Sequence, residues 1–392
     1  MIEKKILNNW LKNNFHRVIE IRRWLHKNPE LGFQEYKTSK FCQSIIEKAG
    51  LKIYYKDGMK TGFYCEFGNK KGPVLALRCD LDALPILEAN KINYKSQNKG
   101  VSHACGHDVH MANIIGTILF FLESKIEISG KIRFIFQPAE EIAPGGAEMM
   151  INSGSIEGAD HIIAAHVLPQ LSSNMIGVKY GDVAARVELI EIIINGSGGH
   201  TSRPHKTENL ILIQAQLLTL LEETINNYSS EKDPIVLVFG EINGGDASNI
   251  IPDQIKIKGT LRYFNLELKS QIYGLISDVI KSIEKISNAQ IKWEIKYASP
   301  GLINDKFCAD LIIEAAKDAI GKENVSILEK GSMGGEDFSY YLERIPGAYF
   351  RIGCSDGYCR DIHTKNFNVD EKCMETAIKV FTHTIIQYFR GK

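Results

Sequence analysis

The sequence predicts an α/β protein: a mostly parallel sheet with helices on both faces, plus an inserted βαββαβ lid or dimerisation domain. Three short apolar runs, at 74–77, 132–136 and 162–165, have the composition of buried strands. Helical periodicity separates them, and strands that alternate with helices are typical of a parallel sheet. The alternation stops near residue 184 and resumes near 299, which indicates an insertion into the first domain.

Apolar residues at helical spacing surround these strands. Val18, Ile21 and Leu25 recur at this spacing. They predict a helix at 4–27, which ends before Pro29 because proline disfavours the helical conformation in its predecessor. Further helices are expected at 35–49, 109–124, 305–320 and 370–389, and a further strand is expected at 348–352.

The inserted segment, 184–298, predicts a compact split βαβ unit. Its last two strands alternate apolar and polar residues, as half-exposed strands do. The expected order is strand 186–195, helix 207–227, strands 234–239 and 254–264, helix 266–286 and strand 291–297. A four-stranded sheet with helices on one face leaves an edge strand that can pair with a second copy.

Length, charge and cysteine content narrow the function classes. A chain of 392 residues predicts about two domains, and its zero net charge without a basic stripe argues against a nucleic-acid partner. No apolar run reaches the roughly 18 residues of a membrane span, and the N-terminus lacks the apolar core of a signal peptide. Eight cysteines without a Cys-x-x-Cys pair are typical of reduced thiols, so we expect a cytoplasmic protein without a membrane partner.

One short stretch, residues 103–110 (HACGHDVH, the octet), concentrates metal-binding side chains. It contains one thiol, three imidazoles and one carboxylate. Transition metals prefer such borderline-soft ligands. Cysteine is also among the most buried residue types, so the octet alone is equally consistent with packing.

Side chains suited to metal binding or acid–base chemistry follow each buried strand. Asp80 and Asp82 follow the first strand, Glu140 and Glu141 the second, and His166 ends the third. The carboxyl ends of parallel strands meet at one edge of a sheet, where ligands bind. We therefore expect these side chains to converge, with the octet close to them.

The number of candidate ligands indicates two ions rather than one. The five expected ligands are Cys105, His107, Glu141, His166 and His363. A structural zinc uses four ligands, whereas five fit two ions with one bridging ligand and open positions for water. A coordinated thiolate can bridge, and Cys, His and Glu together admit zinc, manganese, nickel or cobalt.

The whole chain resembles the metal-dependent amidohydrolase branch of the dinuclear zinc-peptidase superfamily. That branch includes hippurate hydrolases, N-acyl-amino-acid amidohydrolases, auxin-conjugate hydrolases and N-acetyldiaminopimelate deacetylases. The motifs that carry the resemblance are 22–32 (RRWLHKNPELG), 77–85 (LRCDLDALP), 103–108 (HACGHD), 137–141 (QPAEE), 145–147 (GGA), 198–205 (GGHTSRPH), 249–253 (NIIPD) and 333–338 (MGGEDF).

The resemblance implies hydrolysis of the amide bond of N-acyl amino acids, which releases a carboxylate and a free amino acid. Cys105 would bridge two ions, with His107 and His166 on one and Glu141 and His363 on the other. Glu140 would be the general base that later protonates the leaving amine.

The resemblance also assigns supporting positions. Asp82 stands where the superfamily has an acid that orients a metal-binding imidazole, and Asp80 stands where a histidine is usual. His103 is expected to contact the metal ligands without binding a metal itself. His110 is expected to lie on the helix surface or to pack against neighbouring side chains.

The inserted domain has a role by resemblance as well. Residues 1–183 and 299–392 would form the catalytic domain, and 184–298 would form a lid through which the protein dimerises. His200 would stabilise the oxyanion as a hydrogen-bond donor, close to the partner's site. Asn249 and Arg262 would grip the substrate, since arginine suits a carboxylate.

Two alternatives stay open. Cys105 could be the nucleophile of a thiol hydrolase with His107 as its base, although Glu141, His166 and His363 then have no role. The chain could also be a non-catalytic protein that binds N-acyl amino acids, but the intact Glu140 argues against that interpretation.

Overall fold

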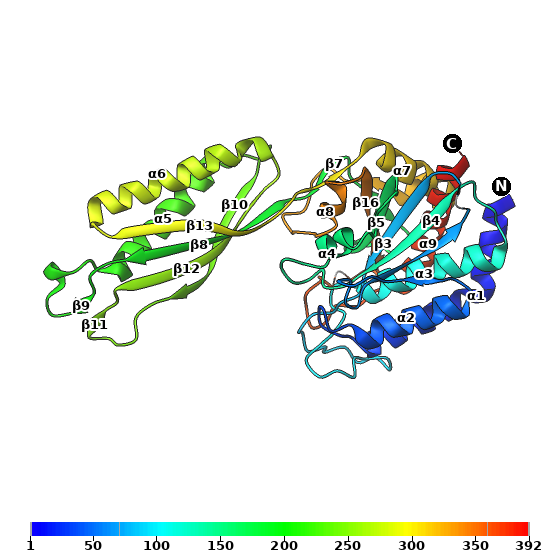
Figure 1. Ribbon diagram of the computed structural model, residues 1–392, viewed down its shortest axis with the longest axis horizontal. Helices are drawn as coiled ribbons and strands as arrows, with labels where there is room; N and C mark the ends of the chain where they lie inside the picture. The colour runs from blue at the N-terminus through cyan, green and yellow to red at the C-terminus, as the bar shows by residue number, and fades with distance from the viewer. Residues whose placement is uncertain (1, 70, 359, 391–392) are drawn as a thin grey trace. The chain divides into compact units, whose positions relative to one another are not determined.

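The computed structural model describes residues 2–69, 71–358 and 360–390, which form two compact units (Figure 1). Unit 1 comprises the described parts of Met1–Val183, Ile303–Gly331 and Asp337–Lys392, and unit 2 comprises Ala184–Leu302 and Ser332–Glu336. The short return segment Ser332–Glu336 belongs to unit 2 because Ala185 donates its N–H to the Ser332 carbonyl at 2.9 Å.

Unit 1 is built on an eight-stranded sheet with the order β1-β2-β4-β3-β5-β16-β6-β15. The strands are β1 (Ile53–Tyr54), β2 (Phe63–Gly68), β3 (Val74–Asp80), β4 (Lys131–Gln137), β5 (His161–Ser172), β6 (Ile176–Val178), β15 (Val325–Ile327) and β16 (Gly347–Ser355). The four central strands, β4-β3-β5-β16, are mutually parallel, which confirms the predicted fold class. Antiparallel β1 and β2 extend one edge, and β6 runs antiparallel to β16.

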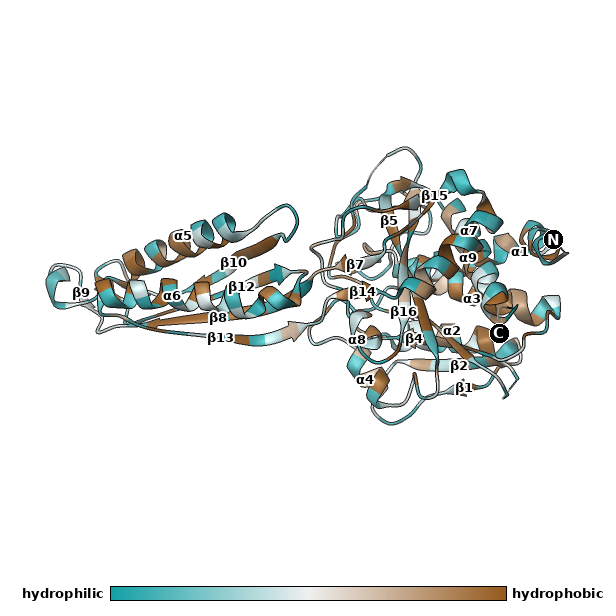
Figure 2. Cartoon of the chain, turned by 90° about the horizontal axis from the view of Figure 1, so that it is seen from above, coloured by the Kyte–Doolittle hydropathy of each residue, from teal (hydrophilic) through white to brown (hydrophobic). Residues whose placement is uncertain are grey.

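Alternation along β3 shows how the sheet divides its two faces. Leu75, Leu77 and Cys79 face the main hydrophobic core, whereas Arg78 and Asp80 are buried on the other face. The core joins the sheet to helices α1 (Ile2–Lys27), α2 (Tyr36–Lys48), α3 (His107–Ser124), α7 (Lys306–Ile320) and α9 (Lys372–Arg390). The short helices α4 (Ala147–Asn152) and α8 (Ser339–Leu342) lie on the opposite face (Figure 2).

Two boundaries differ from the prediction and bear on the site. Strand β5 does not end at His166 but continues to Ser172, because β16 pairs with it beyond that point. Helix α3 begins at His107 rather than at 109, so this histidine occupies the first helical turn. Two short strands, β7 (Gly181–Ala184) and β14 (Leu302–Asn304), pair with each other and were not expected.

Unit 2 has the predicted βαββαβ order. Its elements are β8 (Arg186–Asn195), α5 (Leu210–Tyr228), β10 (Ile235–Asn243), β12 (Gln254–Tyr263), α6 (Lys269–Ser287) and β13 (Gln290–Ser299). The antiparallel sheet has the order β10-β12-β8-β13, so β10 and β13 are its edges. Helices α5 and α6 cover one face of it and enclose a separate core (Figure 1).

Short strands β9 (Gly199–His200) and β11 (Ile250–Ile251) pair with each other in unit 2. They lie at the end of the sheet where β12 begins, since Gly196 donates its N–H to the Asp253 carbonyl at 2.9 Å. In the part of the chain that the structure describes, no helix combines the length and apolarity needed to cross a bilayer.

Candidate metal centre and active site

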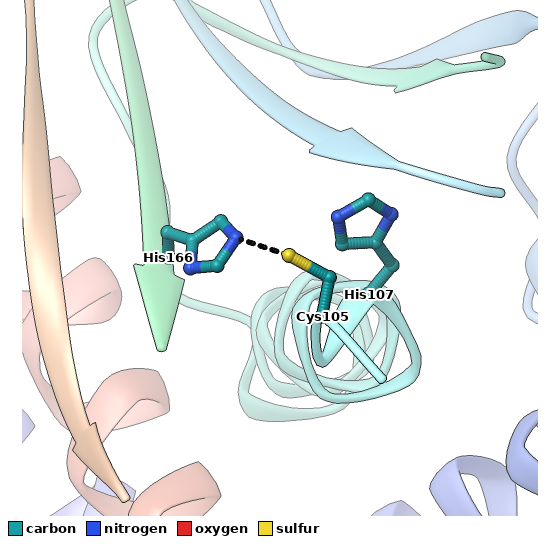
Figure 3. Close-up of side chains that lie close together, drawn as sticks. All are labelled: Cys105, His107 and His166. Carbon is teal, nitrogen blue, oxygen red and sulfur yellow. Dashed lines mark hydrogen bonds between the residues drawn. The ribbon is translucent and has the colours of Figure 1, made fainter. Parts of the chain in front are cut away.

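The first turn of α3 presents two of the expected ligands. Gly106 precedes the helix in the left-handed conformation, with φ +85°, and a Cβ there would lie 2.6 Å from a methyl carbon of Val167. Only glycine fits both constraints without strain. This turn directs Cys105 and His107 towards the space beside β5, where His166 projects (Figure 3).

Main-chain carbonyls orient the two imidazoles of His107 and His166. His107 Nδ1 lies 2.9 Å from the Asp82 carbonyl oxygen, and His166 Nδ1 lies 2.8 Å from the Val167 carbonyl oxygen. A carbonyl only accepts, so Nδ1 carries a proton in each ring and Nε2 is the nitrogen that is left for a metal ion. Metal-binding histidines show this arrangement.

The thiol of Cys105 lies between imidazoles from distant parts of the chain. Its Sγ is 3.2 Å from His166 Nε2 and 3.3 Å from His363 Nε2. His363 Nε2 also lies 3.3 Å from Glu141 Oε1. The His363 N–H donates to the Ala104 carbonyl at 2.8 Å, which joins the C-terminal loop to the octet.

The five expected ligands form two triads that share Cys105. One is Cys105, His107 and His166, and the other is Cys105, Glu141 and His363; within each, the ligand atoms lie within 4.8 Å of one another. His107 Nε2 and Glu141 Oε1 are buried and accept no hydrogen bond from the described residues, although buried polar atoms are normally paired. This donor set fits two divalent cations that share one thiolate.

Without a cation, the protonation states suit a thiol rather than a thiolate. Burial and the Glu141 charge hold the pKa of Cys105 well above its usual value. Burial, together with the neighbouring His110 and Arg351, holds the pKa of His166 well below its usual value. Burial lowers the pKa of His107, but Asp80, Asp82 and Cys105 together outweigh burial, so the pKa is raised. A thiolate nucleophile is therefore disfavoured, whereas coordination would remove the thiol proton.

Asp82 binds the backbone of the two adjacent glutamates. It is fully buried, and its two carboxylate oxygens each accept one N–H, from Glu140 and from Glu141, both at 3.0 Å. Its Oδ1 also lies 3.4 Å from His107 Nδ1, but the nearer acceptor for that nitrogen is the Asp82 carbonyl. The Asp82 carboxylate thus binds the backbone of Glu140 and Glu141 as well as lying beside the His107 ring.

The loop that carries these glutamates follows β4 through a strained turn. Ala139 has φ +53°, a left-handed conformation that costs about 1–2 kcal/mol in a residue with a Cβ. Glu140 follows it, with Oε2 3.9 Å from His107 Nε2. The turn directs Glu140 and Glu141 to the same group of imidazoles.

The two remaining histidines of the octet are buried. His110, for which the helix surface was one expectation, lies inside: its Nδ1 is 2.7 Å from Asp80 Oδ1, and its Nε2 accepts the Val167 N–H at 3.1 Å. Both nitrogens are occupied, so His110 is not a free ligand. His103 is also buried, and burial lowers its pKa to about 4, so its ring is neutral.

The three expected site residues of the inserted domain all belong to unit 2, at two separate places. His200 pairs with Ile250 across β9 and β11, and Thr201 donates its N–H to the Asn249 carbonyl at 3.2 Å. His200 Nδ1 accepts the Ser202 N–H at 3.1 Å, which leaves Nε2 as the N–H donor.

Arg262 lies near the other end of β12. It is half-buried and donates to the Met333 carbonyl at 2.7 Å, within unit 2. It is eight residues from the start of β12 at Gln254, which is about 27 Å along a strand. Unit 2 therefore brings His200 and Asn249 together but keeps Arg262 apart from them.

Comparison with known proteins places the chain in a family. A family model for peptidase family M20/M25/M40 matches residues 76–387. The chain belongs to this family. It is 35% identical to the N-acetyl-L-cysteine deacetylase of Bacillus subtilis, over 92% of this chain and 85% of that protein. It is 38% identical to the N-acyl-L-amino acid amidohydrolase of Geobacillus stearothermophilus, over 73% of this chain and 78% of that protein.

A solved structure of the M20 family is similar throughout. It is a dinuclear metal binding peptidase from Bacillus subtilis, which matches with a TM-score of 0.83 and 32% identity over 97% of this chain and 99% of that chain. The predicted family resemblance is confirmed. The chain is a metal-dependent hydrolase that acts on amide bonds, which argues against a non-catalytic binding protein.

Proposed function

We propose that this M20 hydrolase cleaves the amide bond of N-acyl amino acids and releases a carboxylate and a free amino acid. The observation that carries the proposal is Glu140 beside two triads that share Cys105, one of which contains the adjacent Glu141. Two relatives named for deacetylation or deacylation of amino acids support the substrate class.

Each residue of the site has a distinct part in this reaction. The two triads would hold divalent zinc, manganese, nickel or cobalt ions, which polarise a carbonyl and lower the pKa of water. Glu140 accepts a proton from the attacking water while the water oxygen bonds to the amide carbon of the substrate. It then gives that proton to the nitrogen of the leaving amino acid as the carbon–nitrogen bond breaks.

Glu140→Gln tests this mechanism. The side-chain amide of glutamine cannot accept the proton of the attacking water. We therefore expect kcat on N-acetyl amino acids to fall by about 10³-fold, within the range for general bases. Metal content should stay near that of the wild type. Glu148→Gln, an exposed glutamate in the same segment, is the matched control. Turnover retained in Glu140→Gln would overturn the proposal, and a panel varying the acyl group and the amino acid would define the substrate.

We further propose that the active enzyme is a homodimer through unit 2. His200 and Asn249 lie near the start of β12 at Gln254, which is about 27 Å along the strand from Arg262, too far for one small substrate to contact both sites within a single unit 2. A second copy resolves this: His200 of one copy donates Nε2–H to the oxyanion, while Arg262 of the other binds the substrate carboxylate.

The exposed apolar residues of unit 2 favour one edge for this contact. Val238 on edge strand β10 is 58% exposed, and Ile242, Ile211 and Leu212 on β10 and the adjacent α5 are exposed as well. Val238→Asp should therefore convert the dimer to a monomer in sedimentation. Ile286→Asp, at an exposed position on α6, should not.

Mixing two inactive variants tests whether the partner contributes His200. If it does, a mixed dimer of Glu140→Gln and His200→Ala contains one intact site. Random exchange should then restore about a quarter of the wild-type activity. No recovery in a confirmed mixed dimer would exclude the shared site.

We also place the enzyme in the cytoplasm. Seven cysteines among the described residues are buried thiols, which suits a reducing compartment. Fractionation with a tagged chain tests this assignment.

A further inference from the structure

Glu35 is a buried carboxylate that the chemistry above does not use. It is 0% exposed and comes just before α2, where a side chain could cap the helix, yet it makes no capping hydrogen bond. Glutamate is also not a preferred residue at that position. The residue type is therefore not explained by the helix.

The carboxylate of Glu35 instead accepts hydrogen bonds from three donors outside the helix, two of them on distant segments. Its Oε1 accepts the N–H of Phe33 at 2.9 Å and of Ala139 at 2.8 Å, and its Oε2 accepts the Thr61 hydroxyl at 2.6 Å. Phe33 and Ala139 both have positive φ, +62° and +53°. One oxygen thus holds two left-handed turns against each other.

The turn at Ala139 is the one that directs Glu140. Gly32 packs against it so closely that a Cβ there would lie 3.1 Å from the Ala139 Cβ. Three successive N–H groups, from Ala139, Glu140 and Glu141, end on two buried carboxylates, Glu35 and Asp82. The Ala139 carbonyl accepts the Gly146 N–H at 3.0 Å, so the turn is bonded on both sides.

We propose that Glu35 is a positioning residue for hydrolysis: it holds Ala139 in the left-handed conformation and thereby aims the Glu140 side chain. The inference rests on the proposed role of Glu140 as the base. Glu35 acts from outside the triads, and it touches neither the ligands nor the reacting atoms. Its removal should therefore lower turnover more than substrate affinity.

Glu35→Ala and Glu35→Gln separate positioning from charge. Alanine leaves the Ala139 N–H without its acceptor, and a displacement of about 1 Å costs roughly 100-fold in kcat, with KM changed little. Glutamine keeps Oε1 for the two N–H groups and can donate from Nε2 to the Thr61 hydroxyl oxygen. We expect Glu35→Gln to recover most of the lost kcat.

Glu30→Ala is the matched control. Glu30 lies in the same segment and accepts the Thr38 N–H at 2.8 Å and the Thr38 hydroxyl at 3.0 Å. It therefore makes the same kinds of hydrogen bond, but none of these bonds reaches the loop of Glu140. Glu30→Ala should lower stability while leaving kcat near the wild-type value.

Amide hydrogen exchange in the metal-free protein supplies a readout independent of activity. Peptides covering 138–146 should exchange faster in Glu35→Ala, and no faster than the wild type in Glu30→Ala or Glu35→Gln. Should Glu35→Ala fail to fold, Thr61→Val should speed exchange in the same peptides, and Thr61→Ser should restore the wild-type rate.

Unchanged exchange in 138–146, or a kcat for Glu35→Ala equal to that of Glu30→Ala, would overturn the positioning role. Full activity of Glu140→Gln would instead refute the proposed function. The exchange result for Glu35 would stand in that case, so the two failures are distinguishable.

Discussion

The loss of stability in Asp82→Asn follows from the number of hydrogen-bond acceptors that the side chain keeps. The carboxylate accepts one N–H on each oxygen, from Glu140 and Glu141. Asparagine keeps one oxygen, and its amide N–H₂ then faces the other backbone N–H, so two donors oppose each other in a buried site. A hydrogen bond to a charged group contributes about 1.5–3 kcal/mol, so we expect a loss of about 2–4 kcal/mol in the free energy of unfolding.

The same substitution at Asp305 is the control. Asp305 caps α7 and accepts a single N–H, from Cys308 at 2.9 Å. Asparagine is an equally good cap, so Asp305→Asn should cost only a few tenths of a kcal/mol. Both residues lie in unit 1, so both report on the same unfolding unit.

Urea unfolding of the metal-free protein measures both changes. In a Trp293→Phe background, the remaining tryptophans, Trp10 and Trp24, lie in α1, so their fluorescence reports on unit 1 alone. A loss for Asp82→Asn no larger than that for Asp305→Asn would refute the reasoning. It would mean that the loop moves to find another acceptor, and that Asp82 does not fix Glu140 and Glu141.

The remaining predictions concern the metal and the first turn of α3. A chelator should abolish hydrolysis and an added divalent ion should restore it, whereas the thiol hydrolase alternative predicts activity that survives chelation. Gly106→Ala should cost at least about 1–2 kcal/mol from its φ alone, with a further loss from the contact with Val167, and metal content should fall with it; normal metal content would contradict this. Asp108→Asn should cost about 1.5–3 kcal/mol, because it removes the charged acceptor that lies 2.7 Å from Arg22 Nε and leaves Arg22 with Glu371 at 3.3 Å, whereas Asp310→Asn in an exposed pair should change the urea midpoint little. Burial raises the pKa of Asp108, but Arg22 and His26 outweigh it and hold that pKa far below its usual value. The Asp108 contribution to stability is therefore complete above about pH 4 and is lost only as the pH falls through the folded-state pKa, which an acid titration of wild type and Asp108→Asn would show.

The expected ligands could be chosen from the sequence because their chemistry and position coincide. Carboxylates that follow an apolar strand are unusual beside a thiol and several imidazoles, and the structure places all five ligands in two triads. The burial of His110 could not be predicted from periodicity, because α3 is buried from His107 to Phe121 on every side. A helix without a polar face gives no indication of which of its histidines points inward.

The contact of Glu35 with Ala139, and the distance between Arg262 and Asn249, could not be predicted from the sequence for a different reason. A glutamate before a helix is ordinary, and only the tertiary contact with Ala139 sets it apart. Ala139 itself gives no warning of a left-handed turn, since alanine rarely adopts one. Asn249 and Arg262 are close in the sequence, but an extended strand between them turns a short sequence interval into a long distance.

The orientation of His107 and His166 by main-chain carbonyls has an evolutionary consequence. In many metal sites a carboxylate or other side chain fixes the ligand ring, and a single codon change can remove it. Here the acceptors are the carbonyls of Asp82 and Val167, which every amino acid carries. Sequence drift at those two positions leaves the ring tautomers unchanged as long as the backbone keeps its course. The ligand geometry can therefore outlast divergence at a position such as Val167, whereas the Asp82 side chain is still required by the N–H groups of Glu140 and Glu141.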